Sequence, residues 1–179
     1  MQNMTFSPFY RAEEDYTKRR TFSDFFKIAT YNNAGGPRMA AYLTGLSRGI
    51  FHDAKPEDFL ALYYKIMNYN EAPFDKLAAS GLSPDYVAKE TKRALIGCAG
   101  QVQIYPGIDI DVPVLGANAG GAENKRTHPD DVKKALESAF AAGANGVVLS
   151  REYVEMWTAN LTSAGDTLRA IFAQQASKV

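Results

Sequence analysis

The most constraining feature of this sequence is a short apolar run, Gln101-Val-Gln-Ile-Tyr-Pro-Gly-Ile-Asp-Ile-Asp111. Apolar side chains alternate along its first half, which is the pattern of a buried strand. The strand is predicted to end at Pro106-Gly107, because proline and glycine commonly form turns. Asp109 and Asp111 are then expected in a loop at the carboxyl end of the strand.

Three further runs have the same character, and a helix-patterned segment follows each of the four. Such alternation of strand and helix predicts an α/β fold built from parallel βα units. The strands are predicted at about residues 4–10, 25–31, 101–106 and 146–150.

The segments between the predicted strands are unequal in length. Residues 51–98 fit an insertion of helices, at about 55–67 and 83–96, within a single domain spanning residues 1–179. The turn Asn32-Asn-Ala-Gly-Gly-Pro37 is expected to precede a helix that starts at Pro37. The glycine-rich segment 114–126 is expected to be a flexible loop, either a lid over a site or a plain surface loop. A closing helix from residue 153 to about residue 174 is expected to bury Trp157, Leu161 and Phe172.

Charge and cysteine content exclude several classes of protein. Twenty basic residues balance twenty acidic ones, so neither nucleic acid nor an anionic membrane is expected as a partner. Cys98 is the single cysteine and cannot form a disulfide within the chain, and His52 and His128 lack the spacing of metal ligands. No metal or cofactor is therefore expected. No apolar run approaches the roughly 18 residues of a membrane span, so a soluble chain is expected, of unknown compartment.

The direction of side chains along the predicted strands points to a candidate site. In a parallel strand covered by helices, the apolar alternate residues face the helices and the other set faces inward. Val102, Ile104, Phe26 and Ile28 should therefore face helices. Because ligands of α/β proteins bind at the carboxyl ends of the strands, polar and aromatic residues there are candidates for a site: Arg11, Tyr31, Asn33, Gln103, Tyr105, Asp109, Asp111 and Glu152. In the alternative structural interpretation Arg11 pairs with nearby glutamates, the tyrosines are core residues and the aspartates are ordinary loop carboxylates.

Three longer stretches carry a family resemblance. They are Phe26-Lys-Ile-Ala-Thr-Tyr-Asn-Asn-Ala-Gly-Gly-Pro-Arg38, Gln103-Ile-Tyr-Pro-Gly-Ile-Asp-Ile-Asp-Val-Pro113 and Ala141-Ala-Gly-Ala-Asn-Gly-Val-Val-Leu-Ser-Arg-Glu-Tyr153. Together they resemble the C-terminal half of (β/α)8-barrel proteins of the glycoside-hydrolase-like kind. The resemblance implies half of a TIM-type (β/α)8 barrel that binds or hydrolyses carbohydrate, using two carboxylates at the top of the barrel.

On this resemblance each candidate residue has a role. Glu152 and Asp109 are the candidate catalytic carboxylates. The candidate substrate contacts are Arg11, Tyr31, Asn33, Gln103, Tyr105, Asp111 and Arg151.

Two alternatives remain open. A non-catalytic barrel remnant would use strand-end aromatics to bind carbohydrate or another partner. The run Ala142-Gly-Ala-Asn-Gly-Val-Val-Leu149 resembles the last strand of phosphate-binding barrels. This second resemblance implies a phosphate-binding barrel enzyme, with Arg151 supplying charge. In each case the four strands are half of a barrel, so the chain is expected to form a homo-oligomer or to require a missing N-terminal half.

Overall fold

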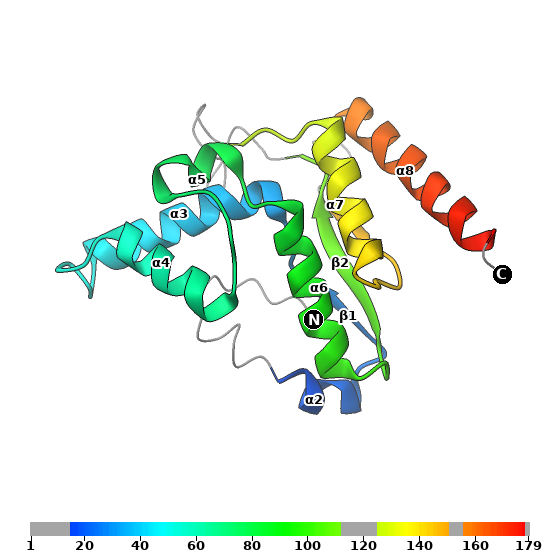
Figure 1. The fold of residues 1–179 in the computed structure, drawn as a ribbon, viewed down its shortest axis with the longest axis horizontal. Helices are drawn as coiled ribbons and strands as arrows, with labels where there is room; N and C mark the ends of the chain where they lie inside the picture. The colour runs from blue at the N-terminus through cyan, green and yellow to red at the C-terminus, as the bar shows by residue number, and fades with distance from the viewer. Residues whose placement is uncertain (1–14, 112–124, 151–155, 178–179) are drawn as a thin grey trace.

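The computed structural model of this chain describes residues 15–111, 125–150 and 156–177. The predicted first strand with Arg11, most of the 114–126 loop, and Arg151 with Glu152 lie outside these ranges. The described residues form a small parallel sheet with helices packed against it (Figure 1).

Three parallel strands form this sheet, in the order β1-β2-β3. They are β1 (Phe25–Ile28), β2 (Gln103–Asp109) and β3 (Val148–Ser150). Phe25 pairs with Gln103 at one end of the sheet, and Asp109 pairs with Ser150 at the other. Strands that follow one another in the described chain are also neighbours in the sheet. The predicted α/β class with parallel pairing is therefore confirmed.

Helices cover one face of the sheet and extend well beyond it. Short elements α2 (Tyr16–Arg19) and η1 (Arg20–Phe22) precede β1. In Figure 1, α6 and α7 lie side by side over the strands, α3, α4 and α5 extend to one side, and α8 lies on the opposite side of α7. The bounds of these helices are α3 (Asn32–Arg48), α4 (Pro56–Met67), α5 (Phe74–Ser80), α6 (Pro84–Cys98), α7 (Pro129–Ala141) and α8 (Thr158–Ala176).

The predicted side-chain parity of the sheet holds where it can be followed. Phe26, Ile28 and Ile104 are buried in one cluster with Ala94 and Cys98 of α6, as expected for residues that face the helices. The alternate residues form the other face, on which Phe25 is 52% exposed. The Phe25 ring contacts the Tyr105 ring edge-on, with 5.7 Å between the ring centroids.

The β2 strand extends beyond its predicted end. Pro106 and Gly107 lie within it, and Asp109 is its last residue, so the prediction that Asp109 enters a loop is wrong. A Cβ atom added at Gly107 would lie 2.8 Å from Cε1 of Tyr31. Gly107 therefore marks the close approach of a tyrosine ring to a strand, which is a common reason for glycine within a sheet.

The α3 helix begins before its predicted start. Asn32-Asn-Ala-Gly-Gly36 is helical, and Pro37 lies inside the helix instead of at its first position. Asp109, far away in sequence, accepts hydrogen bonds from the first turn and thereby supplies the cap that no local residue provides. A glycine pair that looks like a turn is consequently folded as helix.

The closing helix also differs from its prediction. It starts at Thr158 and continues through Gly165. The predicted core residues Trp157, Leu161 and Phe172 are 54%, 39% and 50% exposed, so their predicted burial is wrong. The buried residues of α8 are instead the small or polar Asn160, Ala164 and Thr167.

Candidate functional site

Asp109 lies buried where β2 meets the start of α3. Its Oδ2 accepts a hydrogen bond from the backbone N–H of Ala34 at 2.6 Å, and its Oδ1 accepts one from Asn33 N–H at 3.4 Å. A carboxylate at a helix N-terminus satisfies amide groups that have no partner in the helix and interacts favourably with the helix dipole. Asp109 therefore fixes the first turn of α3 against the carboxyl end of the sheet.

Burial has the largest influence on the pKa of this carboxyl group. It raises the pKa of Asp109 from 3.8 to about 6, although the amides of Ala34 and Asn33 and the charge of Arg38 act in the opposite direction. The side chain is thus a buried acid that titrates near neutral pH, with both oxygens already engaged by the backbone of α3.

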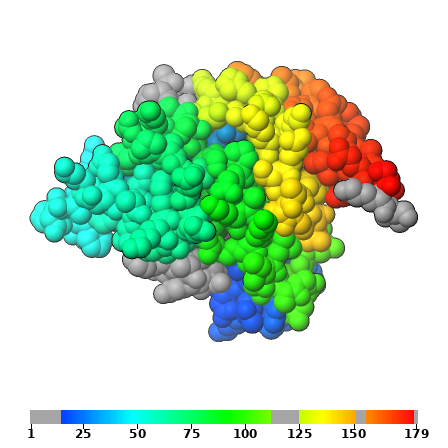
Figure 2. Space-filling model, viewed as in Figure 1, coloured from blue at the N-terminus to red at the C-terminus, as the bar shows by residue number. Residues whose placement is uncertain are grey.

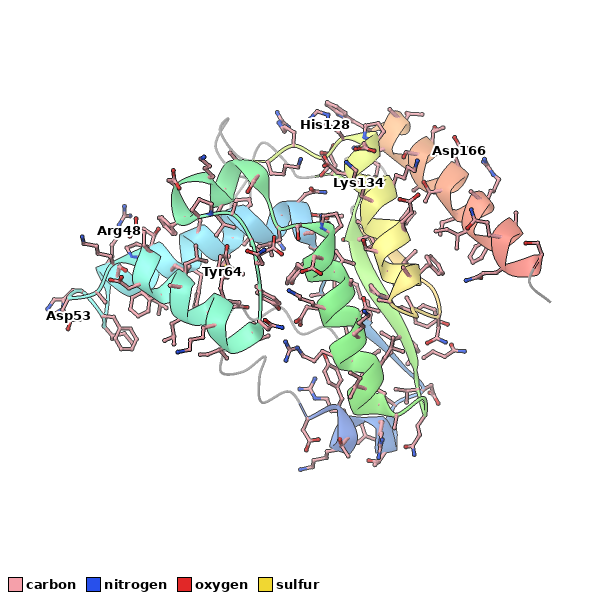
Figure 3. All side chains as sticks on the ribbon, viewed as in Figure 1. Arg48, Asp53, Tyr64, His128, Lys134 and Asp166 are labelled. Atoms are coloured by element: carbon pink, nitrogen blue, oxygen red, sulfur yellow. The ribbon has the colours of Figure 1, made fainter. Side chains whose placement is uncertain are left out.

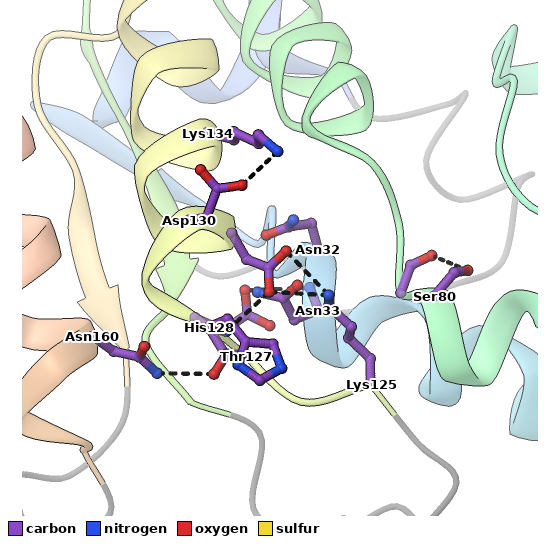
Figure 4. A network of polar contacts seen from close by, with 12 residues as sticks. Asn32, Asn33, Ser80, Lys125, Thr127, His128, Asp130, Lys134 and Asn160 are labelled. Atoms are coloured by element: carbon purple, nitrogen blue, oxygen red, sulfur yellow. Dashed lines mark hydrogen bonds and ion pairs between the residues drawn. The ribbon is translucent and has the colours of Figure 1, made fainter.

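A second buried polar contact joins the end of β2 to the segment before α7 and to the first turn of α8. Asn160 of α8 donates from Nδ2 to the carbonyl oxygen of Ile110 at 2.7 Å and to that of Thr127 at 3.1 Å. Figure 4 shows the Asn160 contact beside the start of α7. The residue just after β2 is thereby held in place by the first turn of α8.

A pocket of about 320 Å³ opens beside the first turn of α3. In Figure 2 it is visible as a hollow between α5, α6 and α7, with blue atoms from the beginning of α3 at its floor. Its size is at the lower end of the range for small-molecule sites. Side-chain amides and hydroxyl groups supply much of its wall, namely Asn32, Asn33, Asn70, Ser80 and Ser83.

Three ionisable residues also line this pocket, and each has a partner in the protein. Glu71 accepts hydrogen bonds from Ser83 N–H at 2.5 Å and from Ser83 Oγ at 2.8 Å. Asp131 lies 3.0 Å from Lys125 Nζ, and Lys134 lies 2.5 Å from Asp130. The Lys134–Asp130 contact is drawn in Figure 4.

The environment of Glu71 favours its protonated form. Its pKa is raised, first by burial and in addition by the charge of Asp85, while the bonds from Ser83 and the charge of Lys89 oppose the shift. Asp131, in contrast, has an ammonium group beside it and accepts the backbone N–H of His128 at 2.9 Å. Two carboxyl groups in unlike surroundings therefore line one pocket.

The predicted site residues fall into two groups. Tyr31, Asn33, Asp109 and Asp111 are all buried at or just beyond the carboxyl ends of β1 and β2, and Asn33 alone of these lines the pocket. Gln103 and Tyr105 lie in the amino-terminal half of β2, where the Tyr105 hydroxyl donates to Gln103 Oε1. Six residues separate Gln103 from Asp109, which is about 20 Å along a strand, so these two predicted contacts are not close to the pocket.

Several pocket residues were missed from the sequence. Glu71, Asn70, Ser83 and Asp131 belong to helix starts and connections that sequence reasoning assigned to the insertion or to capping. The signal was present in Ser83-Pro84-Asp85 and His128-Pro129-Asp130, two helix starts marked by proline. Since helices that connect parallel strands begin at the carboxyl edge of the sheet, such starts gather around the site. Figure 3 shows this arrangement: His128 and Lys134 lie at that edge, whereas Arg48 and Asp53 lie at the far tip of α3 and α4.

Other types of site find no support in residues 15–111, 125–150 and 156–177. Across these ranges, no cluster of three or more His, Cys, Asp or Glu side chains is arranged to hold a metal ion, and none of the helices has the length and apolar character of a membrane span. Comparisons of the chain with protein-family models, curated proteins and solved structures found no match.

Proposed function

We propose that the pocket between α3, α5, α6 and α7 binds carbohydrate. The observation that carries this proposal is its lining: amide, hydroxyl and carboxyl groups converge on a volume of about 320 Å³. A polyhydroxylated ligand can both donate to and accept from such groups, whereas an apolar ligand would leave them without partners. The position beside the carboxyl ends of β1 and β2 also agrees with the usual placement of ligand sites in α/β proteins.

The charges of the pocket favour a neutral ligand over a phosphorylated one. Lys134, which lines the pocket, already contacts Asp130. The lining also contains the carboxyl groups of Glu71 and Asp131, and Lys125 contacts Asp131. A phosphate would therefore meet acidic side chains as well as engaged lysines. This argues against the phosphate-binding alternative at this pocket.

Hydrolysis is a second candidate function at the same place. Glycoside hydrolysis requires one protonated and one ionised carboxyl group on the two sides of the scissile bond. Burial raises the pKa of Glu71, as a general acid requires, and Asp131, beside Lys125, is the second carboxyl group of the pocket. In this arrangement Asp109 positions α3 instead of reacting, because it holds the first turn of α3 and is not among the residues that line the pocket.

The proposed setting for this pocket is half of a (β/α)8 barrel. Three parallel strands in sequential order, covered by α6 and α7 on one face, are compatible with consecutive units of such a barrel. The opposite face carries Phe25 and Tyr105, and we propose that a second copy of the chain or a missing N-terminal half covers it. Light scattering behind a sizing column tests this: a dimer supports pairing, and a cooperatively unfolding monomer of this chain argues against it.

Calorimetric titration with a panel of methyl glycosides tests the carbohydrate proposal. Ser80→Trp should fill the pocket and weaken binding of a recognised glycoside by about tenfold or more, which corresponds to about 1.4 kcal/mol. The matched control is Gln174→Trp, at an exposed position of α8 outside the pocket, which should bind as wild type does. If both tryptophan variants bind equally well, the ligand binds elsewhere.

For the hydrolytic candidate, release of aryl alcohol from aryl glycosides is compared between wild type and Glu71→Gln. Turnover that falls by about 100-fold or more in the variant would support general acid catalysis by Glu71. Binding without turnover in either form would leave carbohydrate binding as the function.

A further inference from the structure

The floor of the pocket contains a donor and an acceptor that the described residues leave without partners. They are Nδ2 of Asn33 and Oδ1 of Asn32. The two residues are 1% and 2% exposed, and both line the pocket. A buried polar atom that has lost its water and gained no partner destabilises the folded state. Such atoms at a ligand-sized pocket therefore call for an explanation.

Both asparagines are held rigidly by their backbones. Asn33 N–H donates to Asp109, and the carbonyl oxygen of Asn32 accepts a hydrogen bond from Leu82 N–H at 2.8 Å. The Asn32 side chain is also fixed, because its Nδ2 donates to the Leu82 carbonyl oxygen at 3.3 Å. That carbonyl can only accept, so the orientation of the Asn32 amide is determined and its Oδ1 is the atom without a partner.

The close packing of α3 keeps these side chains at the floor of the pocket. A Cβ atom added at Gly36 would lie 2.3 Å from the Leu77 carbonyl oxygen and 2.6 Å from Cα of Gly81. The first turn of α3 thus rests directly on the connection between α5 and α6, which forms a wall of the pocket. A ligand therefore has to uncover only the two side-chain amides, which are almost fully covered in the free protein, since their backbone is already in place.

The fold gives the backbone N–H of Asn33 a hydrogen-bond partner but gives none to its side-chain Nδ2. Asparagine is a weak helix former compared with alanine, and Asn33 Nδ2 forms no hydrogen bond with the described residues. We propose that Asn32 and Asn33 recognise two neighbouring hydroxyl groups of the ligand, with Asn33 donating to one and Asn32 accepting from the other. This inference rests on the proposed carbohydrate-binding function and specifies which part of the sugar the two asparagines contact.

A pair of hydroxyl groups fits these atoms better than other ligand groups do. A carboxylate or phosphate only accepts, so it would satisfy Asn33 and oppose the Asn32 oxygen. An ammonium group only donates and would have the converse defect. Each hydroxyl group can donate and accept, so two adjacent ones satisfy both asparagines at once.

The test combines binding with stability for Asn33→Ala. The probes are methyl glucoside, methyl mannoside and methyl galactoside, with inorganic phosphate as an anionic comparison. Binding of a recognised glycoside should shift the side-chain amide resonances of Asn33, and Asn33→Ala should weaken that binding by about tenfold or more. The urea midpoint of the variant should stay the same or rise, because the lost donor has no partner in the fold. Gln174→Ala, at an exposed position of α8 outside the pocket, is the control and should bind within about threefold of wild type.

Each other outcome overturns a specific claim. If a glycoside binds in the pocket and Asn33→Ala binds it equally well, the role of Asn33 is refuted while carbohydrate binding survives. If Asn33→Ala lowers the urea midpoint as much as Asn32→Ala, which removes the bond to Leu82, then Asn33 is structural. If phosphate displaces the glycoside and shifts the same amide resonances, hydroxyl recognition is wrong. If no glycoside binds, the proposed function itself fails and this inference fails with it.

Discussion

The two ends of the same small sheet are stabilised by different means. Beneath α6, the amino-terminal half packs Phe26 and Ile104 against Ala94 and Cys98, all nearly excluded from solvent. At the carboxyl end, Ile108 and Ile110 are also buried in an apolar cluster, but buried hydrogen bonds, such as those of Asp109 to the first turn of α3, are added to the apolar contacts. Apolar burial tolerates many side chains of similar volume, whereas a buried polar contact requires particular atoms in particular places.

This difference separates stability from recognition. The apolar end contributes free energy without specifying a ligand. The polar end carries Asn32 and Asn33 with unpartnered atoms beside a pocket, which lowers stability and offers hydrogen bonds to a ligand. Such a trade of stability for function is common in binding sites.

The largest effect is expected from the apolar end. Ile104 is fully buried in its cluster, so Ile104→Ala should destabilise the fold by about 3–4 kcal/mol through lost burial and the cavity left behind. Urea unfolding measures this. The control is Ile96→Ala on α6, where the side chain is 80% exposed and the change should be within about 0.5 kcal/mol. Equal effects at the two positions would contradict the assignment of Ile104 to the core.

Asp109 should make the polar end sensitive to pH. Its pKa is raised from 3.8 to about 6 in the folded state, so the native protein holds this proton more tightly than the unfolded chain. The resulting stabilisation is fully present below about pH 4 and is lost as pH rises through about 6, with a total of up to about 3 kcal/mol. Asp109→Asn should lack this component.

The measurement is a series of urea unfolding curves from pH 4 to pH 8. The stability of wild type relative to Asp109→Asn should fall across the interval from about pH 4 to pH 6 and then level off. Two pH profiles that run parallel would mean that Asp109 does not titrate in this range. The unfolding free energy of Ile104→Ala should vary with pH as that of wild type does, but it should be lower at every pH.

The sequence predicted the parts of the molecule that depend on local pattern. The βα alternation, the parallel pairing and the direction of Phe26 and Ile104 toward the helices all follow from apolar periodicity within one segment. The start of α3 could not be predicted in this way, because its cap is Asp109, which lies far away in sequence. Gly107 and Gly36 misled for a similar reason: each permits close packing against a distant residue, whereas a local pattern shows glycine as a turn.

The candidate site was predicted only in part for a related reason. Asn33 and Asp109 were found because they follow predicted strands. Glu71 and Asp131 lie at helix starts and connections, and the sequence gives no distance between such segments. Their convergence depends on how α5, α6 and α7 pack around the first turn of α3.

A smaller effect is expected from the packing of that first turn. Gly36→Ala would place a methyl group against the backbone of Leu77 and Gly81, which cannot move aside as a flexible side chain would. We expect a loss of about 2 kcal/mol and weaker glycoside binding. Gly45→Ala is a matched control in the same helix, since nothing lies within 4 Å of the added Cβ, and it should stabilise by about 0.5–1 kcal/mol. If Gly36→Ala stabilises the protein as much as Gly45→Ala does, helix propensity decides at this position and not close packing.

The smallest change in stability is expected at Glu71, where the gain from hydrogen bonds and the cost of burying a carboxyl group nearly cancel. Its carboxylate accepts from the backbone N–H and the hydroxyl of Ser83, but burial raises its pKa and so opposes its charge. In Glu71→Gln the amide oxygen can still accept the backbone N–H, while the new NH₂ group can donate to the Ser83 hydroxyl once that hydroxyl rotates. Both bonds survive and the variant buries no charge, so unfolding free energy at neutral pH should change by less than about 1 kcal/mol. Glu71→Ala leaves the Ser83 donors without this acceptor and should be clearly less stable than Glu71→Gln in the same urea experiment. If Glu71→Gln is as unstable as Glu71→Ala, the negative charge itself holds the pocket wall, and Glu71 would then be ionised and unsuited to act as an acid.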